Sequence, residues 1–141
     1  MGNVISATTR FARKEQARDR FLSSAHDLIE QAEAYMEAGD WALALESAYQ
    51  AALRTAGARN VSSPVIAKRK RLPSSAWDRL RLVDERGASR AQELGGYSAL
   101  RSRVVSGIVP DPEPAVVTAL FNAAREFLME VDAEAGWLSV A

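Results

Sequence analysis

Apolar residues recur every three or four positions along most of this chain, and no stretch alternates apolar with polar residues for long. Spacings of three and four place side chains on one face of an α-helix, whereas strict alternation is typical of a half-buried β-strand. Alanine is also frequent, and β-branched residues rarely cluster. These patterns predict an all-α protein that folds as an up-and-down antiparallel bundle of four main helices.

Local signals at the ends of the apolar stripes set the expected boundaries. Gly39 can adopt a positive φ and Asp40 can cap the next helix, so a tight antiparallel hairpin should join the first two helices. Arg86 and Gly87 are candidates for an interruption that would break the third helix into two. Residues 57–72 should form the longest break. The helices are expected over residues 9–38, 41–56, 76–104 and 112–136.

The length of 141 residues suggests one domain, which we place at residues 21–136. Residues 1–20 are a charged N-terminal extension or the start of the first helix, and residues 137–141 form a short apolar tail. No run of about 18 apolar residues exists, so we expect a cytoplasmic protein without a membrane partner.

The rarest residue types exclude several kinds of chemistry. The chain has no cysteine and a single histidine, so it has no disulfide, cysteine nucleophile, thiolate zinc site or histidine-rich metal cluster. We therefore expect neither a metal nor a cofactor.

Charge is distributed in bands, although the net charge is zero. Residues 54–103 carry twelve basic and four acidic side chains, whereas residues 21–53 carry six acidic and no basic ones. Residues 104–141 carry six acidic side chains and one basic. Such asymmetry indicates either an external polyanion or pairing with acidic side chains of this chain, a second copy or another protein.

The centre of the basic band is the run Lys68-Arg69-Lys70-Arg71, which lies in the expected break. Consecutive basic side chains in a loop can follow a phosphate backbone, and a neighbouring tryptophan can stack on a base. Core packing at a helix start is the alternative for Trp77. The candidate residues for binding nucleic acid or another anion are Lys68, Arg69, Lys70, Arg71, Trp77 and Arg79.

Arg20 and His26 form the only Arg-x5-His pattern and are the candidate residues for a ribonuclease site. Six residues turn about 600° on a helix, so the two side chains point about 120° apart and cannot reach one phosphate from a continuous helix. We therefore assign no catalytic residue and expect His26 to have no chemical partner.

Several segments together resemble the HEPN superfamily (higher eukaryotes and prokaryotes nucleotide-binding), and within it a small stand-alone actinobacterial subfamily. They are the hairpin FLSSAHDLIEQAEAYMEAGDWALALESAYQAALRTA, the basic loop, Ser75-Ala76-Trp77 at the start of the third helix, Tyr97 and the final helix around ALFNAAREFLMEV. The resemblance implies a bundle of four to five helices that is often a homodimer.

Members of that superfamily act as ribonucleases, toxins, antitoxin partners or modules that bind nucleotides and RNA. The nuclease members carry an Arg-x4-6-His pattern late in the bundle, with a polar residue after the arginine. Here the only histidine is in the first helix, and Phe21 follows Arg20. The resemblance therefore supplies no catalytic residue.

We expect a non-catalytic HEPN-like domain that binds RNA, DNA or a nucleotide through its basic loop. The alternatives are a protein-interaction module, as a homodimer or with an acidic partner, and a ribonuclease that uses Arg20 and His26.

Overall fold

A computed structural model of the chain describes the backbone of residues 3–140 and the side chains of residues 7–136. All regular structure within that range is helical, as the apolar spacing predicts. In chain order the helices are α1 (Asn3–Glu37), α2 (Trp41–Ser62), α3 (Pro64–Lys68), α4 (Ala76–Val83), α5 (Glu85–Gly95), α6 (Ser98–Val105) and α7 (Pro114–Val140).

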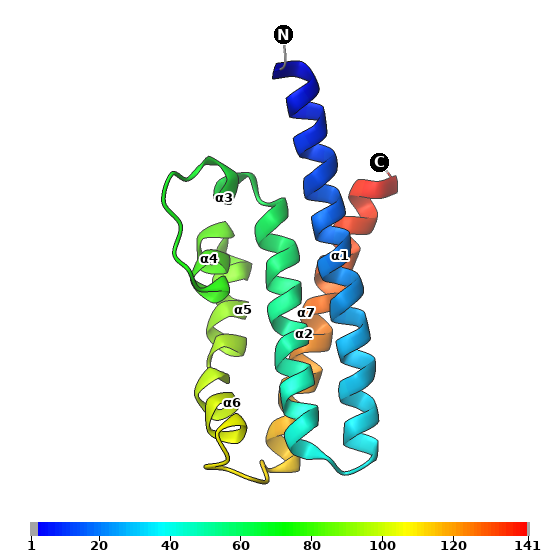
Figure 1. The fold of residues 1–141 in the computed structure, drawn as a ribbon, viewed down its shortest axis with the longest axis vertical. Coiled ribbons are helices and arrows are strands. Elements are labelled where there is room, and N and C mark those ends of the chain that lie inside the picture. The colour runs from blue at the N-terminus through cyan, green and yellow to red at the C-terminus, as the bar shows by residue number, and fades with distance from the viewer. Residues whose placement is uncertain (1–2, 141) are drawn as a thin grey trace.

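The helices form four rods that run up and down, with both chain ends at the same end of the bundle (Figure 1). α1 and α2 are the first two rods. The short helices α4, α5 and α6 follow one another along the other side of α2 and make the third rod, and α7 is the fourth. The predicted bundle is confirmed, but its third rod is divided into three helices and not two.

The two breaks in the third rod have different causes. At Asp84 the backbone is extended (φ −170°, ψ −177°), and the side chain accepts a hydrogen bond of 2.7 Å from the Gly87 amide. Asp84 therefore ends α4 and caps α5, so the first break lies two residues before the expected one. The second break lies at Gly96 and Tyr97, and α6 begins there without a side-chain cap.

The α1–α2 hairpin forms as predicted. Gly39 has a φ of +76°, and the Asp40 side chain accepts a hydrogen bond of 3.2 Å from the Leu43 amide. Alanines without any exposed surface line the facing sides of the two helices and let their backbones approach closely. These alanines are Ala25, Ala32, Ala44, Ala48 and Ala52. Larger side chains from the other rods complete the core: Leu80, Leu94, Leu120, Phe121, Phe127, Leu128 and Val131.

Two helix boundaries differ from the prediction. α2 continues through Gly57 to Ser62, because Gly57 serves close packing and does not end the helix: a Cβ there would lie 2.7 Å from Cε1 of Phe21. α7 begins at Pro114 and not near Asp111, and the Glu113 carbonyl accepts its first backbone hydrogen bonds.

α7 also continues through the expected apolar tail to Val140. The side chains of this tail, among them Trp137 and Leu138, lie outside the described residues. No helix in the described range has both the length and the hydropathy to cross a membrane.

Candidate nucleic-acid interface

The run Lys68–Arg71 lies where α3 gives way to a loop. Ser63 caps α3 by accepting a hydrogen bond from the Ile66 amide, and Ile66 is buried, so the short helix is anchored to the bundle. At Arg69 the backbone turns extended (φ −80°, ψ 135°) and leaves the helix. All four basic side chains are exposed, and none of them forms an ion pair with another described residue.

Arg79 supports this loop from α4. Its Nε donates a hydrogen bond of 2.6 Å to the Pro73 carbonyl, and its side chain is half-buried. Asn60 of α2 holds the start of α4, since its Nδ2 donates a hydrogen bond of 3.1 Å to the Ala76 carbonyl. The sequence predicts that Arg79 binds an anion, but in the structure its Nε donates a hydrogen bond to the backbone of the loop.

Trp77 does not lie beside the basic side chains. It is only 7 % exposed, and its indole Nε1 donates a hydrogen bond of 2.9 Å to the Tyr49 hydroxyl. The predicted stacking of Trp77 on a base is therefore corrected to core packing, the alternative that the sequence left open. The reason is that Trp77 and Leu80 face α2 together, three residues apart on a helix of only eight residues.

Three arginines of the basic band pair with carboxylates that lie on other elements of the bundle, whereas the ion pair of Arg81 with Asp78 stays within α4. Arg59 makes two hydrogen bonds to Asp84 (2.8 and 2.6 Å), which raise the pKa of the guanidinium and lower the pKa of the carboxyl. Arg59 also lies 3.5 Å from Glu134 of α7. It therefore links α2 to the third rod and to the fourth.

Arg90 and Arg101 act in the same way. Arg90 of α5 binds Glu130 of α7, and that hydrogen bond raises the pKa of the guanidinium. Arg101 of α6 binds Glu46 of α2 at 2.7 and 2.8 Å, which lowers the pKa of the Glu46 carboxyl. The basic band thus contains arginines that join the rods, Arg79, which holds the loop backbone, and basic side chains that face solvent.

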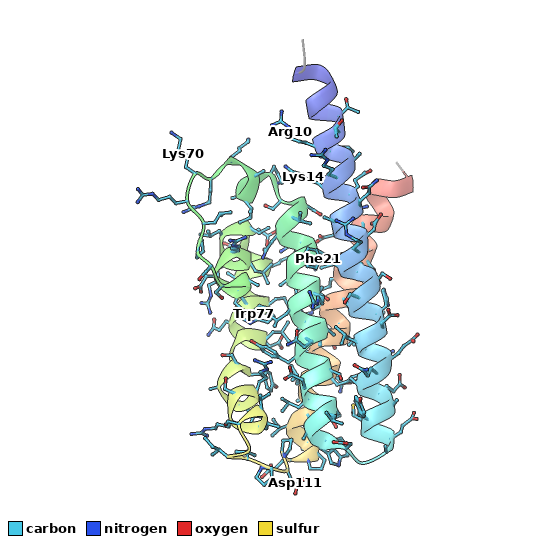
Figure 2. The ribbon with its side chains drawn as sticks, viewed as in Figure 1. Arg10, Lys14, Phe21, Lys70, Trp77 and Asp111 are labelled. Carbon is cyan, nitrogen blue, oxygen red and sulfur yellow. The ribbon has the colours of Figure 1, made fainter. Side chains whose placement is uncertain are left out.

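The amino-terminal part of α1 adds basic side chains at the same end of the bundle as the loop. Figure 2 shows Arg10 and Lys14 of α1 at the end that also carries Lys70. Arg13 is exposed there as well. We call the surface formed by Arg10, Arg13, Lys14 and Lys68–Arg71 the basic end.

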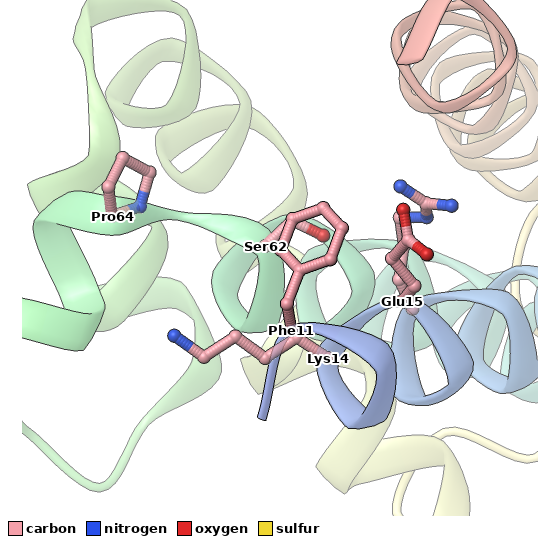
Figure 3. A pocket seen from close by; sticks show the side chains of 6 residues that line it. Phe11, Lys14, Glu15, Ser62 and Pro64 are labelled. Carbon is pink, nitrogen blue, oxygen red and sulfur yellow. The ribbon is translucent and has the colours of Figure 1, made fainter. Parts of the chain in front are cut away.

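A pocket of about 380 Å³ lies between α1 and the α2–α3 junction, and Lys14 of the basic end is one of the residues that line it. Figure 3 shows the Phe11 ring in this pocket, with Lys14 extending toward the side of Pro64 and Glu15 extending the other way. The residues that line the pocket are Phe11, Lys14, Glu15, Arg18, Ser62 and Pro64.

The sequence predicts residues 1–20 to be a charged extension or the start of the first helix, but it does not single out Phe11. Phe11 shares one helix face with Arg18, Ala25 and Ala32 at spacings of seven, so the face that packs in the bundle continues beyond the core. Arg18 on that face is still buried, with only 6 % of its surface exposed, whereas Phe11 is 65 % exposed. The period-seven spacing was the available signal.

The structure does not bring Arg20 and His26 together. Arg20 lies near Arg54 of α2, where both line a shallow pocket of about 250 Å³. His26 faces α7 instead, and its Nε2 lies 2.5 Å from Oδ2 of Asp132. His26 therefore has a carboxylate partner, contrary to the sequence-based expectation, but Arg20 is not part of that contact. In the described range no three His, Asp or Glu side chains are grouped so that they could hold a metal ion.

We compared the chain with curated proteins, with solved structures and with protein families. No curated protein and no solved structure matches the chain significantly. The comparison with families supports the resemblance noted in the sequence. The SAV_6107-like HEPN family matches residues 36–132, which is more than half of the chain. The matched part includes the basic loop and excludes Arg20, His26 and Phe11. This chain therefore belongs to the SAV_6107-like HEPN family.

Proposed function

We propose that this HEPN domain binds nucleic acid through its basic end and does not cleave it. The observation that carries the proposal is the contrast between two groups of basic side chains. Arg59, Arg90 and Arg101 are bound to carboxylates, whereas Lys68–Arg71 are exposed and form no ion pair with a described residue.

An exposed cation that forms no ion pair within the protein can bind a phosphate directly. Binding through Lys68–Arg71 needs no internal ion pair to break, and each phosphate that they neutralise releases condensed counterions. Lys68 at the end of α3 and Arg69, Lys70 and Arg71 in the loop after it are consecutive, so they can contact neighbouring phosphates of a flexible strand. Arg59, Arg90 and Arg101 could bind a phosphate only if the contacts between rods were given up.

The test compares two variants that each lose four positive charges. The loop variant replaces Lys68, Arg69, Lys70 and Arg71 by alanine. The control variant replaces Arg81, Arg86, Arg103 and Arg125, which are exposed elsewhere on the bundle. Fluorescence anisotropy with mixed-sequence oligonucleotides measures the affinity, and circular dichroism verifies that both variants fold.

We expect the loop variant to bind at least about tenfold more weakly than the wild type at low salt, because it lacks the phosphate contacts. The control variant should bind nearly as well as the wild type. Equal losses in the two variants would mean that only net charge matters, and no binding by the wild type would refute the proposal.

A second candidate function is self-association, which an apolar surface at the end of α6 favours. Val105 and Ile108 are 61 % and 73 % exposed and lie three residues apart. Sedimentation of the wild type and of the Ile108→Glu variant tests this function. A dimer that dissociates in the variant would support it, and a wild-type monomer at all concentrations would exclude it.

A further inference from the structure

We infer that the basic end takes single-stranded nucleic acid, with one unpaired base stacked on the Phe11 ring. This inference rests on the proposed function and specifies its ligand. It uses the pocket between α1 and the α2–α3 junction, which the charge pattern alone does not identify.

The first argument is the position of the aromatic ring. Phe11 is 65 % exposed although it lies on the bundle-facing side of α1, because α1 projects beyond the end of α2 at this point (Figure 1). A large apolar side chain so placed gains little from the fold of its own chain. Its ring face is available to another flat, apolar group.

The second argument is the polarity around the ring. Lys14 extends from one side of Phe11 and Glu15 from the other (Figure 3). Arg18 also lines the pocket, but it is buried and its guanidinium is paired with Asp19. A phosphate would be repelled by the Glu15 carboxylate but could bind Lys14, whereas the amino groups on base edges can donate to a carboxylate. The pocket therefore suits a base, with its flanking phosphates on Lys14 and on the basic loop.

The third argument concerns size and accessibility. A volume of about 380 Å³ lies within the range of roughly 300–1,000 Å³ that is usual for small-ligand sites. In a duplex the faces of the bases are covered by their neighbours everywhere except at the two ends, so a single strand offers Phe11 far more base faces than a duplex does. Alternating aromatic and basic groups are typical of proteins that bind single strands.

The experiment separates stacking from charge by changing the ligand. Anisotropy is measured with a labelled single strand of about 12 nucleotides, with its blunt duplex, and with an abasic strand of the same length and charge. Single strands of RNA and of DNA are both used, because the stacking argument applies equally to either. The wild type, Phe11→Ala, Phe11→Leu and Phe11→Trp are compared, and Met129→Ala is the control for losing an exposed apolar side chain on α7.

We expect Phe11→Ala to weaken binding of the single strand roughly five- to hundredfold and to leave binding of the abasic strand almost unchanged. Phe11→Trp should restore the affinity, whereas Phe11→Leu should not, because leucine has no aromatic face. Alanine favours a helix, so these differences should not come from unfolding of α1.

Two failures are distinguishable. The stacking inference would be overturned by any of three results: Phe11→Ala weakens binding of the single strand and of the abasic strand equally, Phe11→Leu binds the single strand as tightly as the wild type, or the wild type prefers the duplex. The proposed function would stand in each case. If the wild type binds none of the three ligands, the proposed function itself fails. Binding of single strands of RNA but not of DNA would support stacking and add recognition of the 2′-hydroxyl.

Discussion

The indole Nε1 of Trp77 donates a hydrogen bond of 2.9 Å to the Tyr49 hydroxyl, and the two rings meet edge to face with their centroids 6.1 Å apart. The contact joins α4, the first helix of the third rod, to the middle of α2. The Arg101 guanidinium lies 5.9 Å from the centroid of the same Tyr49 ring. Tyr49 therefore connects α2 to both ends of the third rod.

We predict that Tyr49→Phe lowers the free energy of unfolding by about 1–2 kcal/mol, because the buried indole N–H loses its acceptor. Trp77→Ala should lower the free energy of unfolding by about 3–5 kcal/mol, since it also leaves a cavity in the core. Urea denaturation measures both changes. An unchanged stability of Tyr49→Phe would show that water or another group replaces the hydroxyl.

The Glu46–Arg101 pair should make stability depend on pH in a defined direction. The hydrogen bond from Arg101 lowers the pKa of the Glu46 carboxyl in the folded state. Its stabilising contribution is therefore complete above the ordinary glutamate pKa of about 4.3 and is lost as the pH falls through the lower folded value.

We predict that Glu46→Gln lowers the free energy of unfolding by about 0.5–1 kcal/mol at pH 7, since both side chains are about a third exposed. The difference from the wild type should begin to shrink as the pH falls below the ordinary glutamate pKa of about 4.3, and it should vanish below the lower folded value, where the glutamate of the folded wild type is protonated as well. Denaturation at several pH values measures it. Glu30→Gln, at an exposed position, is the control, and a deficit that stays constant down to pH 3 would contradict the prediction.

Two glycines within helices should respond oppositely to alanine. A Cβ at Gly87 would overlap the carbonyl oxygen of Leu80, whereas a Cβ at Gly136 would meet nothing within 4 Å. We expect Gly87→Ala to lower the free energy of unfolding by about 1–3 kcal/mol, because the new Cβ would meet the backbone of Leu80, which cannot move aside as a flexible side chain could. Gly136→Ala should stabilise by up to about 1 kcal/mol through helix propensity. Thermal unfolding of the two variants distinguishes these signs, and equal shifts would show that the third rod adjusts freely at Gly87.

His26 should not support RNA cleavage. A ribonuclease site made of Arg20 and His26 needs both side chains at one phosphate, but His26 contacts Asp132 of α7 and Arg20 lies near Arg54 of α2. We predict that His26→Ala and the wild type leave a labelled RNA equally intact. Cleavage by the wild type that disappears in His26→Ala and persists in Asp132→Ala would refute the non-catalytic assignment.

The parts of the fold that the sequence predicts correctly depend on neighbouring residues. Gly39 and Asp40 set the α1–α2 hairpin within two positions, and the apolar spacing identifies the rods. The breaks in the third rod were harder to place, because Asp84 is recognisable as a cap only when the chain on both sides of it is known to be helical. Gly57 shows the same difficulty, since its role depends on Phe21 in another helix.

The site was only partly predictable for a similar reason. The run Lys68–Arg71 is visible in the sequence, and the structure leaves all four side chains exposed. The arginines that join the rods bind carboxylates 25 to 55 residues away, and no local pattern identifies such partners. Phe11 was missed because its exposure depends on α1 projecting beyond α2, a difference between two helix lengths.

The salt dependence of nucleic-acid binding tests the central claim most directly. For four phosphates on a single strand, the logarithm of the association constant should fall with the logarithm of the salt concentration at a slope of at least about −3. The wild type and the variant that replaces Arg81, Arg86, Arg103 and Arg125 should both show this slope, and the variant that lacks the charges of Lys68–Arg71 should show one that is shallower by about 3. Equal slopes for all three proteins would contradict the account.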